Sequence, residues 1–234
     1  MKPFLLFFSF LLLLTSCSDQ IKGEGDAQLA QDFMVENFSD IEASGKFKLL
    51  LIPNDSAYVS VQSHRNLIEN MDIYVRNKTL TIAEKKNVDS FESYVIYLYY
   101  TNELKSIEIS EKVLLESAST LTFDKFKISA KDQAVVQQFV LNAKEVDLKV
   151  DDKAEVRISG TASTVDLKAK DYASVEIESL PTKVLKVDLS GEAEVMANVN
   201  KELKGRVLQN STLRYIGSAV KDVDVKDKGE IINK

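Results

Sequence analysis

A repeat of about 19 to 20 residues in the C-terminal half of the chain restricts the fold more than any other feature. Its unit is a triplet of apolar residues separated by polar ones, the pattern of a β-strand with one buried face. The clear copies are Phe126, Ile128 and Ala130; Val146, Leu148 and Val150; Val165, Leu167 and Ala169; and Leu185, Val187 and Leu189. Weaker copies begin at Ile107 and Ile109 and fade through Val207 to Val223 and Val225. One unit cannot bury its own apolar face, so the copies must stack on one another.

Each triplet is followed by a polar corner, then a small residue, then a second apolar position. The corners are Asp132, Asp152, Asp171, Gly191 and Ser211, and the small residues are Ala134, Ala154, Ala173 and Ala193. The second apolar positions are Val136, Val156, Val175, Val195 and Tyr215. This order predicts an all-β fold, a parallel β-helix (β-solenoid) of about six turns.

An antiparallel meander with evenly spaced hairpins is the alternative fold. The Asn-Gly and Asp-Gly pairs typical of tight hairpins are absent from this half of the sequence, which favours the solenoid. In the solenoid register, opposite charges lie side by side, as at Arg157 and Glu176. Like charges also meet, as at Lys186 and Arg206.

The N-terminus has the pattern of a lipoprotein signal peptide, which we place at residues 1–16. Lys2 precedes an apolar run over residues 4–14, which is too short to cross a bilayer as a permanent helix. Leu14-Thr15-Ser16-Cys17 matches the lipobox, so we expect Cys17 to carry the lipid. The alternative is an ordinary signal peptide that contains a cysteine. Cys17 is the only cysteine of the chain, which favours lipidation over a disulfide.

The polar residues 17–31 predict a lipidated, flexible tether, and residues 32–234 the folded domain. We therefore expect an exported protein anchored by lipid to a bacterial membrane. Asp19 favours the outer membrane, and both its periplasmic face and the cell surface stay open.

Composition excludes some functions. The net charge of −6 and the pI near 5.1 argue against nucleic acid and against electrostatic binding to anionic lipid. The hydrophobic fraction of 44% is large enough for a real core.

Residues 33–100 are strand-like without a clear period. An apolar run over residues 47–52 ends at Pro53-Asn54-Asp55, a turn signal. Residues 94–100, YVIYLYY, predict a strand buried on both faces. Its tyrosines suit core or interface packing better than the alternative, a platform for carbohydrate.

Few residues point to chemistry. His64, the only histidine, lies in the polar segment Ser63-His64-Arg65-Asn66, which we interpret as a solvated loop rather than part of a Ser-His-Asp triad. Stacked carboxylates at Asp132, Asp152 and Asp171 could bind Ca²⁺ or act as an acid/base pair. Like charges at the strand spacing repel, and Asp suits tight corners, so we favour a corner role. We expect no catalytic residue, no metal site and no cofactor.

Taken together, the chain resembles the auto-transporter adhesin head GIN domain family of cell-envelope lipoproteins over about residues 33–231. The matching segments are Phe38-Ser39-Asp40-Ile41, Ala43-Ser44-Gly45-Lys46-Phe47, residues 49–52, Asn66-Leu67-Ile68, Ile73-Tyr74-Val75, Thr79-Leu80-Thr81-Ile82 and residues 104–110. The resemblance implies a right-handed β-helix with irregular N-terminal strands and an adhesive or ligand-binding role. The sequence departs from the family pattern at Lys78, where a turn glycine would be comfortable.

These observations favour a non-enzymatic, lipid-anchored protein whose flat, charged surface binds a protein or glycan. The alternatives are a carbohydrate-active enzyme that uses the stacked aspartates, and an envelope protein whose exposed last turn, near Val223 to Ile231, associates weakly with a second copy.

Overall fold

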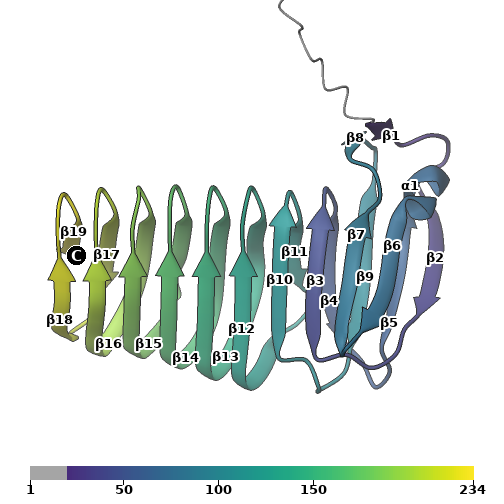
Figure 1. The fold of residues 1–234 in the computed structure, drawn as a ribbon. Coiled ribbons are helices and arrows are strands. Elements are labelled where there is room, and N and C mark those ends of the chain that lie inside the picture. The colour runs from purple at the N-terminus through teal and green to yellow at the C-terminus, as the bar shows by residue number, and fades with distance from the viewer. Residues whose placement is uncertain (1–19) are drawn as a thin grey trace, which may run out of the picture.

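The structure is a computed structural model that describes residues 20–234. The predicted signal peptide of residues 1–16 and Cys17 lie outside the described residues. The described chain forms one long flattened coil of β-strands with a thicker N-terminal end (Figure 1). Residues 20–234 contain no helix that is both long and apolar enough to span a bilayer.

The elements fall into two groups. The N-terminal group is β1 (Ile21–Lys22), β2 (Leu29–Met34), β3 (Asp40–Gly45), β4 (Lys48–Pro53), β5 (Tyr58–Ser63), α1 (Arg65–Glu69), β6 (Met71–Arg76), β7 (Thr79–Glu84), β8 (Val88–Ser90) and β9 (Tyr94–Tyr100). The coil group is β10 (Ser106–Glu111), β11 (Leu114–Ser117), β12 (Leu121–Ala130), β13 (Val135–Val150), β14 (Glu155–Ala169), β15 (Ser174–Leu189), β16 (Glu194–Val207), β17 (Thr212–Ile216), β18 (Val220–Val225) and β19 (Glu230–Asn233).

The predicted stacking is confirmed, with about six turns. Leu148 lies beside Leu167 and Leu167 beside Val187 on successive parallel strands, all three buried. In Figure 1 the near strands run upward, the far strands run downward and successive coils advance to the left, so the coil is right-handed. The repeat predicted the register of the triplets, and the family resemblance implied the right-handed coil.

The buried columns continue into the N-terminal group, but not in chain order. Leu80 of β7 lies beside Ile41 of β3, and Ile41 lies beside Ile107 of β10. On the far side β9, β4 and β11 stack in the same order. The coil that contains β3 and β4 is therefore inserted between a later segment of the chain and the regular repeats.

Antiparallel strands cover the first coil. On the far sheet, β9 pairs with β5 and β5 with β2, while on the near sheet β7 pairs with β6. Asn77 and Lys78 join β6 to β7 and both have positive φ, so Lys78 occupies the strained position of a tight hairpin turn. This cap ends the parallel stacking and forms the irregular N-terminal strands expected from the sequence.

Strands of the domain begin earlier than the expected boundary at residue 32. Ile21 pairs with Val88 of β8, and the Asn66 side-chain amide donates to the Lys22 carbonyl at 2.6 Å. Strand β2 then adds Leu29–Met34 to the far sheet. Ala27 is buried, and Ile21 and Leu29 pack against the core, so residues 21–31 belong to the domain in the structure rather than to a tether.

Two predicted positions in the last coils are wrong. The left-handed corner after Gly191 is Gln209 rather than Ser211, and Ser211 lies in the column of small residues. Leu213, not Tyr215, lies beside Val195. The reason is a shorter coil: Gln209 follows Gly191 by 18 residues, whereas Asp152 follows Asp132 by 20.

The same shortening changes a charge pair. The expected like-charge neighbours Lys186 and Arg206 do not meet, because Lys186 lies beside Lys204 and Asp188 beside Arg206. Arg206 Nη2 and Asp188 Oδ2 are 2.7 Å apart. The predicted pair of Arg157 and Glu176 is confirmed as neighbours on adjacent strands.

Leu167→Ala tests the stacked core. Leu167 is fully buried in the middle of its column, so we expect the substitution to lower the free energy of unfolding by about 2–5 kcal/mol. Urea denaturation of the purified protein measures this. The matched control is Lys168→Ala at the next, exposed position, where a change within about 0.5 kcal/mol is expected. Equal effects at the two positions would contradict the stacked arrangement.

Candidate functional site

The aspartate column lies at the tight corners of the coil. Asp132, Asp152 and Asp171 have φ values of 62°, 61° and 59°, and Gly191 continues the column at 75°. The Ala154 N–H donates to the Asp151 carbonyl at 3.2 Å, which makes Asp152 the first central residue of a β-turn. Asp tolerates this left-handed conformation because its short side chain bonds to nearby backbone.

The carboxylates at these corners accept hydrogen bonds from the neighbouring coil. Asp132 Oδ2 accepts from the Glu111 N–H at 3.0 Å, and Asp152 Oδ2 accepts from the Asp132 N–H at 3.3 Å. Further along, the Gln209 side-chain oxygen accepts from the Gly191 N–H. Within residues 20–234 no group of three or more acidic, histidine or cysteine side chains could hold a metal ion. This geometry makes the column a set of turns.

The near sheet presents a flat lattice of charges. Lys127, Asp147, Asp166 and Lys186 lie side by side on four successive strands. Lys125 Nζ lies 3.1 Å from Asp147 Oδ2, and both side chains are well exposed. Exposed pairs of this kind contribute only about 0.2–1 kcal/mol each. These charged side chains therefore contribute little to the stability of the coil, and their main effect is on the distribution of charge over its surface.

His64 is not in a solvated loop, as the sequence suggested. Its side chain is 4% exposed and packs against Gly23, where an added Cβ would lie 2.2 Å from the imidazole. Nε2 accepts from the Glu92 N–H at 3.2 Å, and Nδ1 lies 3.0 Å from the Gly25 carbonyl. These partners place the proton on Nδ1. His64 is therefore a structural link between the N-terminal segment and the loop before β9.

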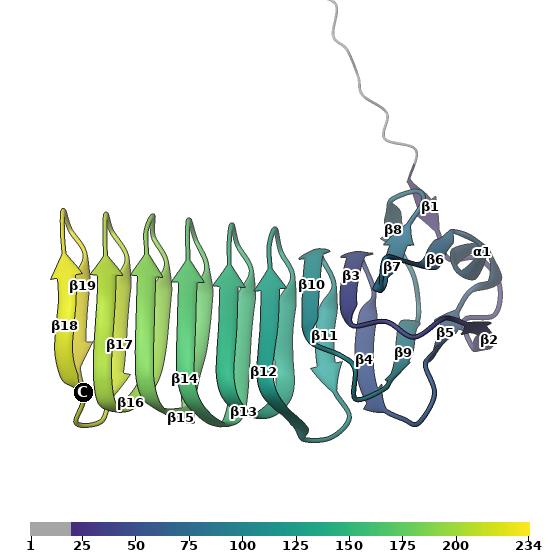
Figure 2. The same cartoon turned by 60° about the horizontal axis from the view of Figure 1, so that its bottom comes forward.

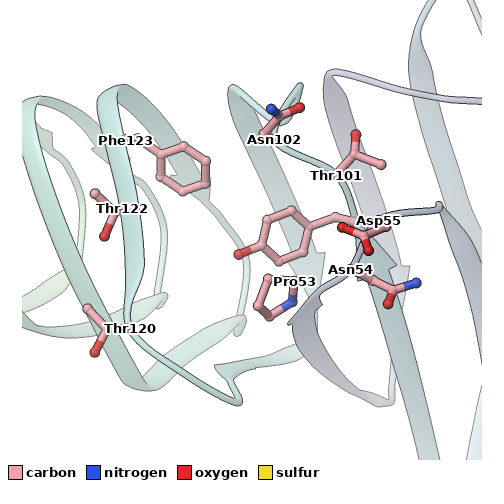
Figure 3. A pocket seen from close by; sticks show the side chains of 9 residues that line it. Pro53, Asn54, Asp55, Thr101, Asn102, Thr120, Thr122 and Phe123 are labelled. Carbon is pink, nitrogen blue, oxygen red and sulfur yellow. The ribbon is translucent and has the colours of Figure 1, made fainter.

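A cleft of about 590 Å³ opens where the cap meets the first coils (Figure 3). It lies at the edge opposite the aspartate corners, among three connections that are far apart in the sequence. The lining residues are Pro53, Asn54 and Asp55 after β4; Tyr100, Thr101 and Asn102 at the end of β9; and Thr120, Thr122 and Phe123 around the start of β12.

Backbone contacts hold two of these connections in place. The Asn54 N–H donates to the Tyr100 carbonyl at 2.8 Å, and the Ala118 N–H donates to the Leu51 carbonyl at 3.0 Å. The Asn54 side-chain amide closes its own turn on the Ser56 carbonyl at 2.9 Å. The cleft walls are thus attached to the ends of the stacked strands.

Aromatic side chains form the apolar part of the lining. Phe123 stacks on the buried Phe126, with ring centroids 4.4 Å apart and planes inclined by 7°. In Figure 3 the Phe123 ring lies on one side of the cleft and Pro53, Asn54 and Asp55 on the other. Tyr100 is 5% exposed, and burial raises the pKa of its hydroxyl to about 12.

Several polar groups of the cleft have no partner among the described residues. The side chains of Asp55, Asn102, Thr120 and Thr122 are exposed and make no hydrogen bond or ion pair there. Together they offer hydroxyl, amide and carboxylate groups to a ligand. From the sequence, Pro53-Asn54-Asp55 was identified only as a turn, and Tyr100 only as part of the strand-like segment 94–100, whose tyrosines had a carbohydrate platform as the less favoured interpretation. No local signal could have joined these residues to Asn102 and Phe123, because the three segments meet only in the folded chain.

The chain is similar to proteins that are named as putative adhesins. The family model described as "Putative auto-transporter adhesin, head GIN domain" matches residues 37–219. No curated protein matches the chain.

Solved structures share the fold at low sequence identity. A "putative adhesin" from Bacteroides fragilis is 19% identical, with a TM-score of 0.83, over 92% of this chain and 100% of that one. A "putative adhesin" from Parabacteroides merdae is 18% identical, with a TM-score of 0.74, over 92% and 99% of the two chains. One from Parabacteroides distasonis is 21% identical, with a TM-score of 0.72, over 92% and 100%.

The corner geometry predicts how the alanine and glycine variants of Asp152 rank in stability. Alanine at position 152 cannot accept the hydrogen bond from the Asp132 N–H and adopts positive φ less readily than aspartate, so Asp152→Ala should lower the free energy of unfolding by about 1–2 kcal/mol. Asp152→Gly should cost less, because glycine adopts this conformation freely. Urea denaturation of both variants gives the order, and a glycine variant less stable than the alanine variant would contradict the corner role.

The buried Tyr100 hydroxyl predicts a loss of stability in alkali. The unfolded chain loses this proton near the ordinary pKa of 10, whereas the folded chain keeps it to about 12. The folded state therefore binds more protons across this interval, and its stability falls as the pH rises through it. Tyr100→Phe should reduce the slope of stability against pH between about 10 and 12, measured by urea denaturation. Parallel curves for the two proteins would contradict the assignment.

Proposed function

The chain belongs to the auto-transporter adhesin head GIN domain family, and from this we propose that it is a non-enzymatic, lipid-anchored protein of the bacterial cell envelope that presents a rigid surface for adhesion. The family supports an adhesion-type role and an exported or cell-envelope location. Cys17 carries the anchor in this proposal, and the outer membrane is the membrane that holds it.

The observation that carries the proposal is the family match over residues 37–219 on a rod with long exposed faces. Parallel stacking repeats the same side-chain positions at the strand spacing of about 4.8 Å. A flat, regularly spaced surface suits a ligand that is itself extended or repetitive, such as a matrix protein or a polysaccharide.

The short distance between Cys17 and the first strand supports an oriented anchor. Three residues lie between Cys17 and Ile21, and the four residue-to-residue steps that join them span at most about 14 Å. Ile21 is held by the Asn87 carbonyl at 3.0 Å and by its pairing with β8. A lipid on Cys17 would therefore keep the capped end of the rod close to the membrane.

The cap and the coils lie at different positions relative to the proposed attachment point. In Figure 2, β1 and β8 lie at the upper edge of the cap, and the coils extend sideways from it toward β19. The coils thus extend away from the point of attachment, where their faces are accessible to a ligand.

The enzymatic alternative rests on Asp132, Asp152 and Asp171. Two of these carboxylates accept backbone hydrogen bonds at corners, so we do not extend the proposal to catalysis.

The anchor and the adhesion are tested together in the producing bacterium. Cells labelled with a clickable fatty acid should transfer label to the wild-type protein and not to Cys17→Ala, which should leave the membrane fraction. Adherence of the cells to immobilised extracellular matrix or glycan should fall in the deletion strain and in the Cys17→Ala strain, and return with the wild-type gene.

A matched control is Lys168→Ala, at an exposed position of the coil, which should keep both the label and the membrane location. Label on Cys17→Ala would contradict the anchor. Unchanged adherence of the deletion strain across all surfaces would contradict the adhesive role.

A further inference from the structure

The cleft of Figure 3 has a lining without positive charge. Its nine residues include no Lys, Arg or His, and Asp55 is the only carboxylate. An anionic ligand would find no counter-charge there, and a cation would find a single acid. A neutral ligand rich in hydroxyl groups can instead donate to Asp55 and exchange hydrogen bonds with Asn102 and the threonines.

A row of apolar side chains leads up to this cleft on the far sheet. Met34, Tyr58, Tyr99 and Ile52 lie side by side on β2, β5, β9 and β4. Met34 is 80% exposed, and the Tyr58 and Tyr99 rings stack with centroids 4.0 Å apart. In the chain, Ile52 directly precedes Pro53 and Tyr99 directly precedes Tyr100, so the row ends where the cleft begins.

This combination matches the two kinds of surface on a sugar. Pyranose rings carry hydroxyl groups around their edge and C–H groups on their faces, and aromatic and aliphatic side chains cover such faces. The row crosses four strands at a spacing of about 4.8 Å, close to the length of one pyranose unit in an extended glycan. An extended chain laid across the strands would therefore meet one side chain of the row per sugar.

The cleft also faces the correct direction for an external polymer. Strands β1 and β8 lie at one edge of the cap, and the connections after β4 and β9 lie at the opposite edge in both views (Figures 1 and 2). With the anchor on the β1 side, the cleft opens away from the membrane.

We propose that this cleft and the apolar row of Met34, Tyr58, Tyr99 and Ile52 bind a neutral, extended glycan chain. The inference rests on the proposed adhesive function and names its ligand class and its site. Sugar hydroxyls donate to the Asp55 carboxylate and exchange hydrogen bonds with the Asn102 amide, which orients the sugar, and Phe123 and the row cover its C–H faces.

The test uses the full-length protein solubilised in detergent. Binding is measured to four immobilised polymers: a neutral β-glucan, a neutral mannan, a uronic-acid polymer and a sulfated polymer. We expect a neutral polymer to bind, and added salt to have little effect because no ion pair is involved. The double variant Asp55→Ala with Asn102→Ala should weaken binding at least about tenfold.

Matched controls separate the site from general damage. Asp222→Ala removes an exposed carboxylate on β18, and Tyr172→Ala removes a tyrosine that is 59% exposed at a corner; both should bind as the wild type does. Phe123→Ala should also weaken binding, but Phe123 stacks on Phe126 and contributes to stability. The exposed loop residues Asp55 and Asn102 therefore decide the result.

Two outcomes overturn the inference: salt-sensitive binding of the charged polymers alone, or binding that the double variant leaves unchanged. If no neutral polymer binds while the cells still adhere through the protein, the glycan site is wrong and the adhesive function stands. If adherence does not depend on the protein at all, the proposed function fails with it.

Discussion

The fold depends on lateral contact between equivalent apolar side chains on adjacent parallel strands. Leu80, Ile41, Ile107 and Ile128 begin one such column, which continues through Leu148 and Leu167 to Val187. No coil can bury its apolar residues alone, so each is stabilised by the coils on either side. Hydrogen bonds between the strands fix the register, and a slip by one residue would turn the apolar side chains outward.

Stacking of this kind needs a defined beginning and repeated corners. The antiparallel strands β2, β5 and β6 cover the first coil, which would otherwise present unpaired strand edges. Each corner must reverse the chain in very few residues, and this requires positive φ. Asp132, Asp152 and Asp171 meet that requirement and use their carboxylates on backbone N–H groups or on solvent, and Gly191 meets it without a side chain. At Gly191 an added Cβ would lie 2.7 Å from the Asp171 backbone.

The junction of cap and coil is where the surface stops being regular. Within the coils, neighbouring side chains repeat and the outer face stays flat. At the junction, the loops after β4 and β9 and the start of β12 diverge, and polar groups that have no partner along the ladder surround a cleft. The proposed glycan site therefore lies where the cap interrupts the regular coils.

The sequence by itself predicted the coil, its columns and the corners from Asp132 to Gly191, because apolar residues that alternate at a constant period are buried when equivalent strands stack. It failed where that period changed: the shorter coil after Gly191 moved Gln209 to the corner and Leu213 beneath Val195. Only the tertiary structure decided the burial of His64, the insertion of β3 between β7 and β10 and of β4 between β9 and β11, and the cleft between Asp55, Asn102 and Phe123. These features join segments that are many residues apart, and contacts between distant segments produce no periodic pattern in the sequence.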